Sequence, residues 1–246
     1  MLNGYVGQVG HFGKITAFTL AALMVPAGGC DSSAALPPVP LAAISVDAPR
    51  FEAPEARYQA DPARNRVWSL TRDGVTFHDR SAPEKIFKVP LPGWQWAGSP
   101  YGCLPDLALG PKGEAVITSD VLPTLWRIDA ETLAVSEHRL VLDADTDKDV
   151  GFSGLTYSPM QGVYFAVSHA HGSLWRIDPE FRRGQKIPLS NSVSGACGLT
   201  ARQNIARGRA QFLAGLCVSV PQGSRAIDLA PDQRSAYLRS ATCKAT

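Results

Sequence analysis

Leu125-Trp126-Arg127-Ile128-Asp129 recurs, letter for letter, as Leu174-Trp175-Arg176-Ile177-Asp178. The two copies lie 49 residues apart in a chain of 246 residues. Five identical residues at such a spacing indicate an internal repeat. Repeats of about 40–50 residues made of short apolar runs are typical of sheets arranged around a common axis.

The similarity continues outward from the pentapeptide. Each unit has the pattern of a strand, a Pro/Gly turn, a second strand, a polar turn and a third strand. The two clear units cover 107–129 and 155–178, and a weaker copy covers 58–77. The first turn of each unit carries a proline, and these prolines are 49 and 48 residues apart: Pro62, Pro111 and Pro159.

A fourth, outer strand follows each unit. The candidates are the more polar segments 85–89, 134–141 and 185–189, as expected for edge strands. We therefore predict an all-β fold, a β-propeller of four-stranded antiparallel blades. The aromatic residues of the repeat are predicted to pack between blades: Trp68, Trp126, Phe165 and Trp175.

The blade number predicted from the pattern is four to five, because the repeat weakens after residue 190. Segments 196–202 and 210–220 fit a fourth blade, and 227–238 fits part of a fifth. Two alternatives stay open at this point. Either the segment 43–46 completes the last blade, or the ring is incomplete in a truncated or shifted chain.

Composition and the N-terminal segment indicate an exported protein. Hydrophobic residues make up 45% of the chain and charged residues 19%, with a net charge of +2, which argues against disorder and nucleic-acid binding. Residues 1–30 have the short apolar core of a signal peptide, too short to span a membrane. Residues 31–57 are rich in proline and alanine and are predicted to be a tether, and 58–246 the propeller domain.

Two cleavage sites are compatible with this segment. Ala27-Gly28-Gly29-Cys30 resembles a bacterial lipobox, although Ala27 stands where leucine is usual. Lipidation of Cys30 would make the chain a periplasmic lipoprotein held on the membrane by its N-terminal lipid. The alternative is ordinary cleavage after Ala35.

The other four cysteines form an even set, as expected for disulfides in an oxidising compartment. They allow three pairings. Cys197 and Cys217 lie symmetrically about a turn near residue 207, so they are predicted to face each other across a hairpin. Cys103 would then pair with Cys243 and hold the ring closed.

A resemblance to known families rests on Ser153-Gly154-Leu155-Thr156-Tyr157-Ser158-Pro159 and its continuation to Ser168. This stretch resembles the blade motif of the SdiA-regulated family and of the esterase-like-phytase propellers, and NHL and gluconolactonase propellers share a looser form. Two blades carry the match. The first resemblance implies an exported, calcium-binding propeller. The gluconolactonase resemblance would imply a metal-dependent lactonase, but none of that family's acidic ligands can be matched here.

Two polar clusters are candidate metal sites. Asp143, Asp145, Asp147 and Asp149 alternate along one segment and offer the oxygen ligands that Ca²⁺ takes; Lys148 and Gly154 depart from the EF-hand pattern. The alternative is a solvated loop.

His169 and His171 would share a face if they lie on a strand, and Asp120 holds the position equivalent to His169 in the preceding blade. A polar turn is the alternative for this cluster. Asp61, Asp106 and Asp120 are candidates to approach one another near the channel, where inner strands of different blades meet, but the sequence does not show that they do.

Trp94, Trp96 and Tyr101 form an aromatic loop that suits binding of a protein or carbohydrate, or a plug over the channel. No nucleophile elbow, HExxH motif or phosphate-binding loop occurs. The predicted function is that of a binding or scaffold protein of the envelope, with calcium as a candidate stabilising ion. The predicted partner is an envelope protein or a small ligand. The alternative is a metal-dependent hydrolase of the lactonase or phosphoesterase type, with its site in the channel.

Overall fold

A computed structural model of the chain describes residues 56–98, 103–143, 150–203, 214–230 and 234–243. All described residues belong to one unit, Ala48–Thr246. The predicted signal peptide, Cys30 and nearly all of the predicted tether lie outside the described residues. In the described part of the chain, no helix is long and apolar enough to cross a bilayer.

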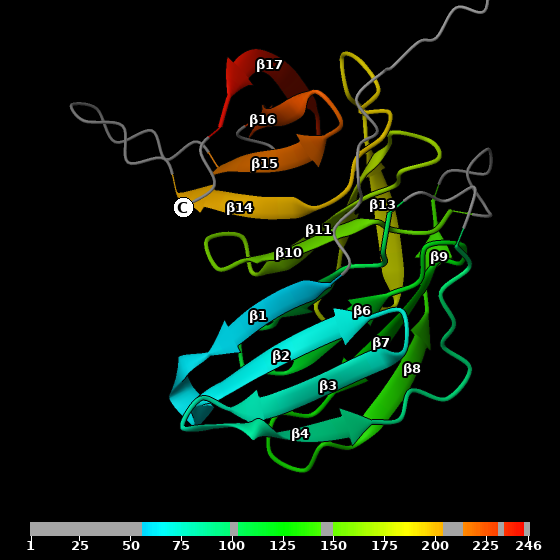
Figure 1. The fold of residues 1–246 in the computed structure, drawn as a ribbon. Helices are drawn as coiled ribbons and strands as arrows, with labels where there is room; N and C mark the ends of the chain where they lie inside the picture. The colour runs from blue at the N-terminus through cyan, green and yellow to red at the C-terminus, as the bar shows by residue number, and fades with distance from the viewer. Residues whose placement is uncertain (1–55, 99–102, 144–149, 204–213, 231–233, 244–246) are drawn as a thin grey trace, which may run out of the picture. The chain divides into compact units, whose positions relative to one another are not determined.

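The described residues form four antiparallel sheets, the blades of a β-propeller (Figure 1). Blade 1 comprises β1 (Arg57–Asp61), β2 (Arg66–Thr71), β3 (Gly74–Asp79) and β4 (Ala82–Val89), with a 3-10 turn, η1, at Pro62–Arg64. Blade 2 comprises β5 (Leu107–Leu109), β6 (Ala115–Thr118), β7 (Thr124–Ile128) and β8 (Val135–Arg139). Blade 3 comprises β10 (Gly154–Ser158), β11 (Val163–Val167), β12 (Leu174–Ile177) and β13 (Arg183–Ile187). Blade 4 comprises β14 (Leu199–Gln203), β15 (Ala214–Val220), β16 (Gly223–Leu229) and β17 (Ala236–Thr242).

Two of the connections between blades pair with the outer strand of the following blade. The short strand β9 (Val141–Leu142), which follows blade 2, adds in parallel to the outer strand β13 of blade 3. In the same way Leu189, which follows blade 3, forms a parallel bridge with Ala236 in the outer strand of blade 4. Each of these connections therefore ties one blade to the outer edge of the next.

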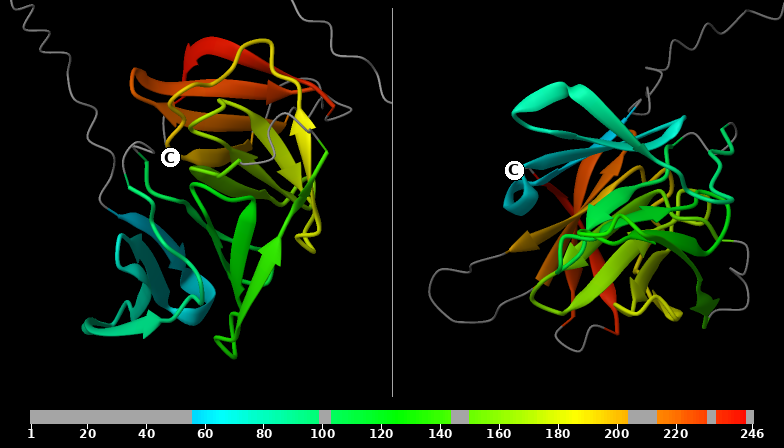
Figure 2. Two further views of the ribbon diagram at one scale, coloured as in Figure 1. Left: turned by 90° about the vertical axis from the view of Figure 1, so that its right-hand side faces the viewer. Right: turned by 90° about the horizontal axis from the view of Figure 1, so that it is seen from below.

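The antiparallel order gives the propeller two distinct ends. The inner strands β1, β5, β10 and β14 lie side by side in that order. We call the end at which they begin the entry pole; it also carries the β2–β3, β6–β7, β11–β12 and β15–β16 turns and the connections between blades. We call the other end the repeat pole, because it carries the Pro/Gly turns that define the repeat. Figure 2 shows the blades from two further sides.

Three hydrophobic cores lie between successive blades. Trp68 and Trp126 belong to the core between blades 1 and 2. Trp175 belongs to the core between blades 2 and 3, and Phe165 to the core between blades 3 and 4. The predicted packing role of these four aromatic residues is confirmed. Among the described residues no hydrophobic cluster joins blade 4 to blade 1.

The all-β propeller prediction is confirmed, with four blades in the described chain. The segment 227–238, predicted as part of a fifth blade, belongs to the fourth instead. The reason is the tight β15–β16 turn, in which Val220 pairs with Gly223. This turn, which the sequence analysis missed, leaves 227–229 in the third strand of the blade and 236–238 in the fourth. The alternative role of 43–46 falls outside the described residues.

The aspartates that end the repeated pentapeptides accept hydrogen bonds from the turns at the repeat pole. Asp129 Oδ1 accepts hydrogen bonds from the backbone N–H groups of Glu131 and Thr132, at 3.0 and 2.8 Å. Asp178 accepts in the same way from three backbone N–H groups of the following turn. The pentapeptide therefore supplies one tryptophan to an inter-blade core and one carboxylate to a turn, which is why it is repeated.

Candidate functional site at the entry pole

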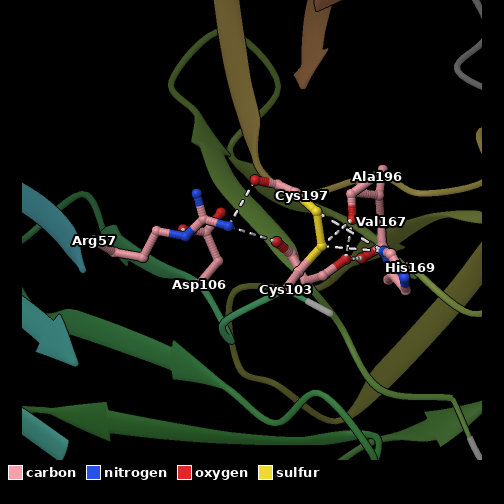
Figure 3. Close-up of a disulfide and its surroundings, with 8 residues drawn as sticks. Arg57, Cys103, Asp106, Val167, His169, Ala196 and Cys197 are labelled. Carbon is pink, nitrogen blue, oxygen red and sulfur yellow. Dashed lines mark hydrogen bonds and ion pairs between the residues drawn. A yellow bond between two sulfur atoms is a disulfide. The ribbon is translucent and has the colours of Figure 1, made fainter. Parts of the chain in front are cut away.

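Arg57, the first residue of β1, lies across the starts of the other inner strands. Its Nη2 donates to the backbone carbonyl of Cys197 at 2.6 Å and, at the longer distance of 3.5 Å, to that of Ser153. Its Nε lies 3.6 Å from Oδ1 of Asp106. One side chain from blade 1 thus contacts a residue just ahead of the inner strand in each of the other three blades (Figure 3).

Asp106 completes this junction from blade 2. Its Oδ1 accepts from the N–H of Leu107 at 2.9 Å and its Oδ2 from the N–H of Leu155 at 2.7 Å, and the N–H of Leu199 is a further donor. These donors lie at the starts of β5, β10 and β14. Burial raises the pKa of the Asp106 carboxyl, while the Arg57 charge and the three N–H groups act against this rise. The pair is a structural junction between the blades, and we call it the hub.

Two disulfides are present, Cys103–Cys197 and Cys217–Cys243. All four predicted cysteines are therefore bonded, but the predicted pairing, Cys197 with Cys217 and Cys103 with Cys243, is wrong. The Cys103–Cys197 bond joins the segment before β5 to the segment before β14 at the entry pole. The Cys217–Cys243 bond lies within blade 4.

The register of the β14–β15 hairpin explains the error. Leu199 pairs with Val218 and Thr200 with Cys217, so the symmetric partner of Cys197 is residue 220. The assumed turn near residue 207 placed the register three residues away. A shift by an odd number also turns a side chain to the opposite face of the sheet, so Cys197 and Cys217 cannot meet.

His169 lies against the Cys103–Cys197 disulfide, as Figure 3 shows. Its Nδ1 is 3.0 Å from Sγ of Cys103 and 3.8 Å from Sγ of Cys197. The two sulfur atoms and Nδ1 lie within 4.8 Å of one another, and this is the group of three potential metal-ligand side chains found in the described part of the chain. Both cysteines are buried and His169 is half-buried.

The premise that placed His169 beside His171 is wrong, because β11 ends at Val167 and both histidines lie in the turn that follows. His171 is exposed, and its backbone N–H donates to Ser168. The residues that accompany His169 are the cysteines. Whether the predicted set of His169, His171 and Asp120 binds a metal stays a prediction.

Asp120 occupies the equivalent turn of blade 2 and is buried. Neither carboxylate oxygen has a hydrogen-bond partner of good geometry among the described residues; the closest donors are its own N–H and that of Ala97. Burial raises the pKa of its carboxyl, and those two N–H groups oppose the rise. Asp61 lies at the repeat pole and pairs with Arg64 at 3.3 Å, so the expected approach of Asp61 to Asp106 and Asp120 does not occur.

The aromatic loop is only partly described. Trp94 packs against the core between blades 1 and 2 and donates to the carbonyl of Thr118 at 3.0 Å. Trp96 lies under the guanidinium of Arg72, whose carbon is 4.5 Å from the ring centre. Tyr101 lies outside the described residues. Trp94 thus has a packing role, and a binding role for this loop stays a prediction.

Of the predicted calcium ligands only Asp143 is described. Its Oδ1 accepts from the N–H of Lys186 at 2.8 Å, which fixes it to the outer edge of blade 3. It lines a surface groove of about 560 Å³ beside β9 and β13. Asp145, Asp147 and Asp149 lie outside the described residues, so calcium binding stays a prediction.

The hub was missed by the sequence analysis. Arg57 was placed at the end of the tether, and Asp106 was considered only as a channel carboxylate. A partial signal was present: Asp106 and Ser153 stand directly ahead of the inner strands of blades 2 and 3, and Cys197 stands two residues ahead of that of blade 4. These residues lie at the same end of their blades, and this is visible only once the strands of the four blades are aligned.

Comparison with known proteins supports the fold and assigns no family. No family model matches the chain. The "Ribosomal RNA small subunit methyltransferase H" of Clavibacter michiganensis is 29% identical over 136 residues, which is 50% of this chain and 42% of that protein, and its counterpart in Clavibacter sepedonicus matches equally. The chain therefore spans less than half the length of these curated relatives. The likeness does not establish membership of their family.

Solved structures show the same architecture. An auxiliary nutrient binding protein from Bacteroides thetaiotaomicron superposes with a TM-score of 0.53 at 13% identity, covering 80% of this chain and 44% of that one. Hydrazine synthase of Kuenenia stuttgartiensis gives 0.50 at 13% identity, with coverages of 75% and 48%. At this identity the likeness shows the β-propeller fold alone. The families resembled by the blade motif are not confirmed.

Proposed function

We propose that this chain is an exported binding or scaffold protein of the bacterial envelope, and that it presents its entry pole to its partner. The observation that carries the proposal is the distribution of differences between the blades. The repeat-pole turns are alike in the first three blades, whereas the entry-pole turns carry Asp120 in one blade and His169 in the next. Loops that differ on a regular scaffold are where binding residues concentrate.

The central charges of this pole are engaged within the protein. Both carboxylate oxygens of Asp106 accept hydrogen bonds from backbone N–H groups, and Arg57 contacts residues of the other three blades. The surrounding turns remain available to a partner: His171 is exposed, and Leu122 is 48% exposed in the β6–β7 turn. Exposed side chains beside a centre whose charges are already paired favour recognition of a partner.

The hydrolase alternative has less support. It requires carboxylates or imidazoles that converge at the axis. In the described ranges the three-ligand group is Cys103, His169 and Cys197, and its sulfur atoms are joined to each other. Export is supported by the two disulfides, which persist in oxidising compartments.

Site-specific photo-crosslinking in native cells tests the binding role. A photoreactive residue at Leu122 or His171 probes the entry pole, and one at Met160, 47% exposed in the β10–β11 turn, is the matched control at the repeat pole. We expect a discrete adduct with one envelope component from the entry-pole positions and none from the control. Equal adducts from both poles, or none from either, would contradict the proposal.

The envelope location and the calcium are tested separately. The substitution Cys30→Ala is expected to release the protein from the membrane fraction into the periplasm if the lipid is used. Metal analysis followed by thermal melting with and without a chelator tests the ion. A bound calcium ion would appear in the analysis, and its removal would lower the melting temperature. An unchanged melt with no bound metal rejects calcium without affecting the binding role.

A further inference from the structure

His169 and the Cys103–Cys197 disulfide bring together the ligand types of a zinc site. We propose that this group is a redox-gated metal site: oxidised, it is a disulfide, and reduced, it binds one thiophilic divalent cation such as Zn²⁺ through Cys103, Cys197 and His169. The two states exclude each other because they use the same sulfur atoms. The inference does not depend on the proposed binding role.

The geometry of the group fits such an ion. Zinc lies about 2.3 Å from thiolate sulfur and about 2.0–2.1 Å from imidazole nitrogen, so a tetrahedral centre separates S and N by about 3.5 Å. The two observed separations, 3.0 Å for Cys103 Sγ and 3.8 Å for Cys197 Sγ, bracket this value. Only the two sulfur atoms must move apart, to about 3.8 Å, once the bond between them is broken.

The three ligands come from separate parts of the fold and are largely shielded from water. The cysteines come from the segments ahead of β5 and β14 and the histidine from the β11–β12 turn, so three blades hold the three ligands. Cys103 Sγ also lies 3.6 Å from the carbonyl oxygen of Ala196, which accepts a hydrogen bond from Ser153 Oγ at 2.6 Å. Both cysteines are buried, whereas half-buried His169 gives solvent access on one side. Three protein ligands leave a fourth position for water or for a partner's side chain.

Conversion of the disulfide to two thiols takes two electrons and two protons. A dithiol reductant gives two electrons to the Cys103–Cys197 bond, which breaks to two thiols while the dithiol becomes a disulfide. Zn²⁺ then displaces one proton from each thiol and takes the lone pair of neutral His169 at Nδ1. Binding therefore releases two protons, and it is opposed by acid.

The second disulfide provides an internal control, because no histidine or carboxylate joins Cys217 and Cys243 in a three-ligand group among the described residues. The test protein is the full chain with Cys30→Ala, Cys217→Ser and Cys243→Ser, which keeps only the two site cysteines. After reduction under anaerobic conditions it is titrated with Co²⁺, which reports tetrahedral thiolate coordination by its visible and charge-transfer absorption. Zn²⁺ then competes for the site.

We expect one equivalent of Co²⁺ to bind the reduced protein, none to bind the oxidised protein, and Zn²⁺ to displace it. His169→Ala should weaken binding by more than about tenfold, whereas exposed His171→Ala, the matched control, should not. Zn²⁺ should also raise the melting temperature of the reduced protein. The proposal is overturned if no metal binds, if His169→Ala binds as well as the parent, or if the reduced protein unfolds and Zn²⁺ does not restore its folding transition.

Discussion

The two poles of this propeller are made from the same strands but hold together in different ways. At the repeat pole, local hydrogen bonds close the turns, such as those that Asp129 accepts from Glu131 and Thr132, and the contact of Arg64 with Glu131 between blades 1 and 2 is exposed. At the entry pole, contacts run between blades: Arg57 reaches Ser153 and Cys197, and Asp106 reaches Leu155. Local contacts can be copied with each repeat, whereas contacts between blades require different residues in each one.

The largest expected effect distinguishes the two disulfides. Cys103→Ser with Cys197→Ser should lower the free energy of unfolding by about 4.7 kcal/mol and Cys217→Ser with Cys243→Ser by about 3.5 kcal/mol, because the first bond closes a separation of 94 residues and the second one of 26. Denaturant unfolding without reductant measures both. A larger loss from the blade 4 pair would show that the bond between blades is the lesser constraint.

The hub should be the next most sensitive feature. Asp106→Ala leaves the half-buried guanidinium of Arg57 without its counter-charge and removes the acceptor for three N–H groups, so we expect a loss of about 3–5 kcal/mol. Asp106→Asn keeps an acceptor and should lose less. Asp129→Ala, which opens only an exposed local turn, is the control at the repeat pole, and its effect on chemical denaturation should be clearly smaller. Equal losses from Asp106→Ala and Asp129→Ala would remove the distinction between the poles.

A smaller effect is expected in the repeat-pole turns, where Asn65, Gly113 and Gly162 take the same left-handed conformation at φ of 51°, 78° and 64°. A Cβ on Gly162 would meet no atom within 4 Å, so Gly162→Ala should lose only the backbone strain, about 1–2 kcal/mol. Gly162→Asn should lose less, since asparagine already holds this position in blade 1. Thermal melting of the two variants measures the difference. Equal losses of stability would show that the left-handed backbone conformation is not the cause.

The smallest effect concerns pH and has opposite signs at the two poles. Hydrogen bonds from Ser81 to Asp79, and from Thr132 to Asp129, lower the pKa of these repeat-pole carboxyls. Their contribution to stability is present above the unfolded pKa of about 4 and is lost as the pH falls through the folded value. The pKa of Asp106 is raised instead, so its contribution diminishes as the pH rises from about 4 through its folded value.

Asp79→Asn combined with Asp129→Asn should therefore flatten the acid side of the stability profile, and Asp106→Asn should not. The measurement is the melting temperature of each variant across about pH 2 to 6. An unchanged acid side in the double variant would show that these turn carboxylates do not respond to acid as their hydrogen bonds indicate.

The fold could be predicted because the signals that specify it lie close together in the sequence. Trp126 and Trp175 recur with their pentapeptide, the prolines recur with their turns, and alternation of apolar residues sets which face of each strand is buried. Where local signals weakened, the prediction erred. The tight turn after Val220 was not recognised, and without it the fourth blade was divided between two.

The candidate site could be predicted only in part, for the same reason. His169 was singled out because it departs from its counterpart Asp120, and this comparison needs no structure. Its neighbours, Cys103 and Cys197, are 66 and 28 residues away in the chain. No spacing rule links residues of three blades that meet only because their inner strands begin at one end.

The sequence by itself thus determined the repeat, the antiparallel blade and the identity of the bonded cysteines, since each depends on residue type and short-range periodicity. Only the tertiary structure decided which cysteines pair, that Arg57 and Asp106 join the blades, and that a histidine lies against a disulfide. Those features depend on strand register and on the order of blades around an axis. A shift of three residues in one hairpin was enough to exchange the partners of all four cysteines.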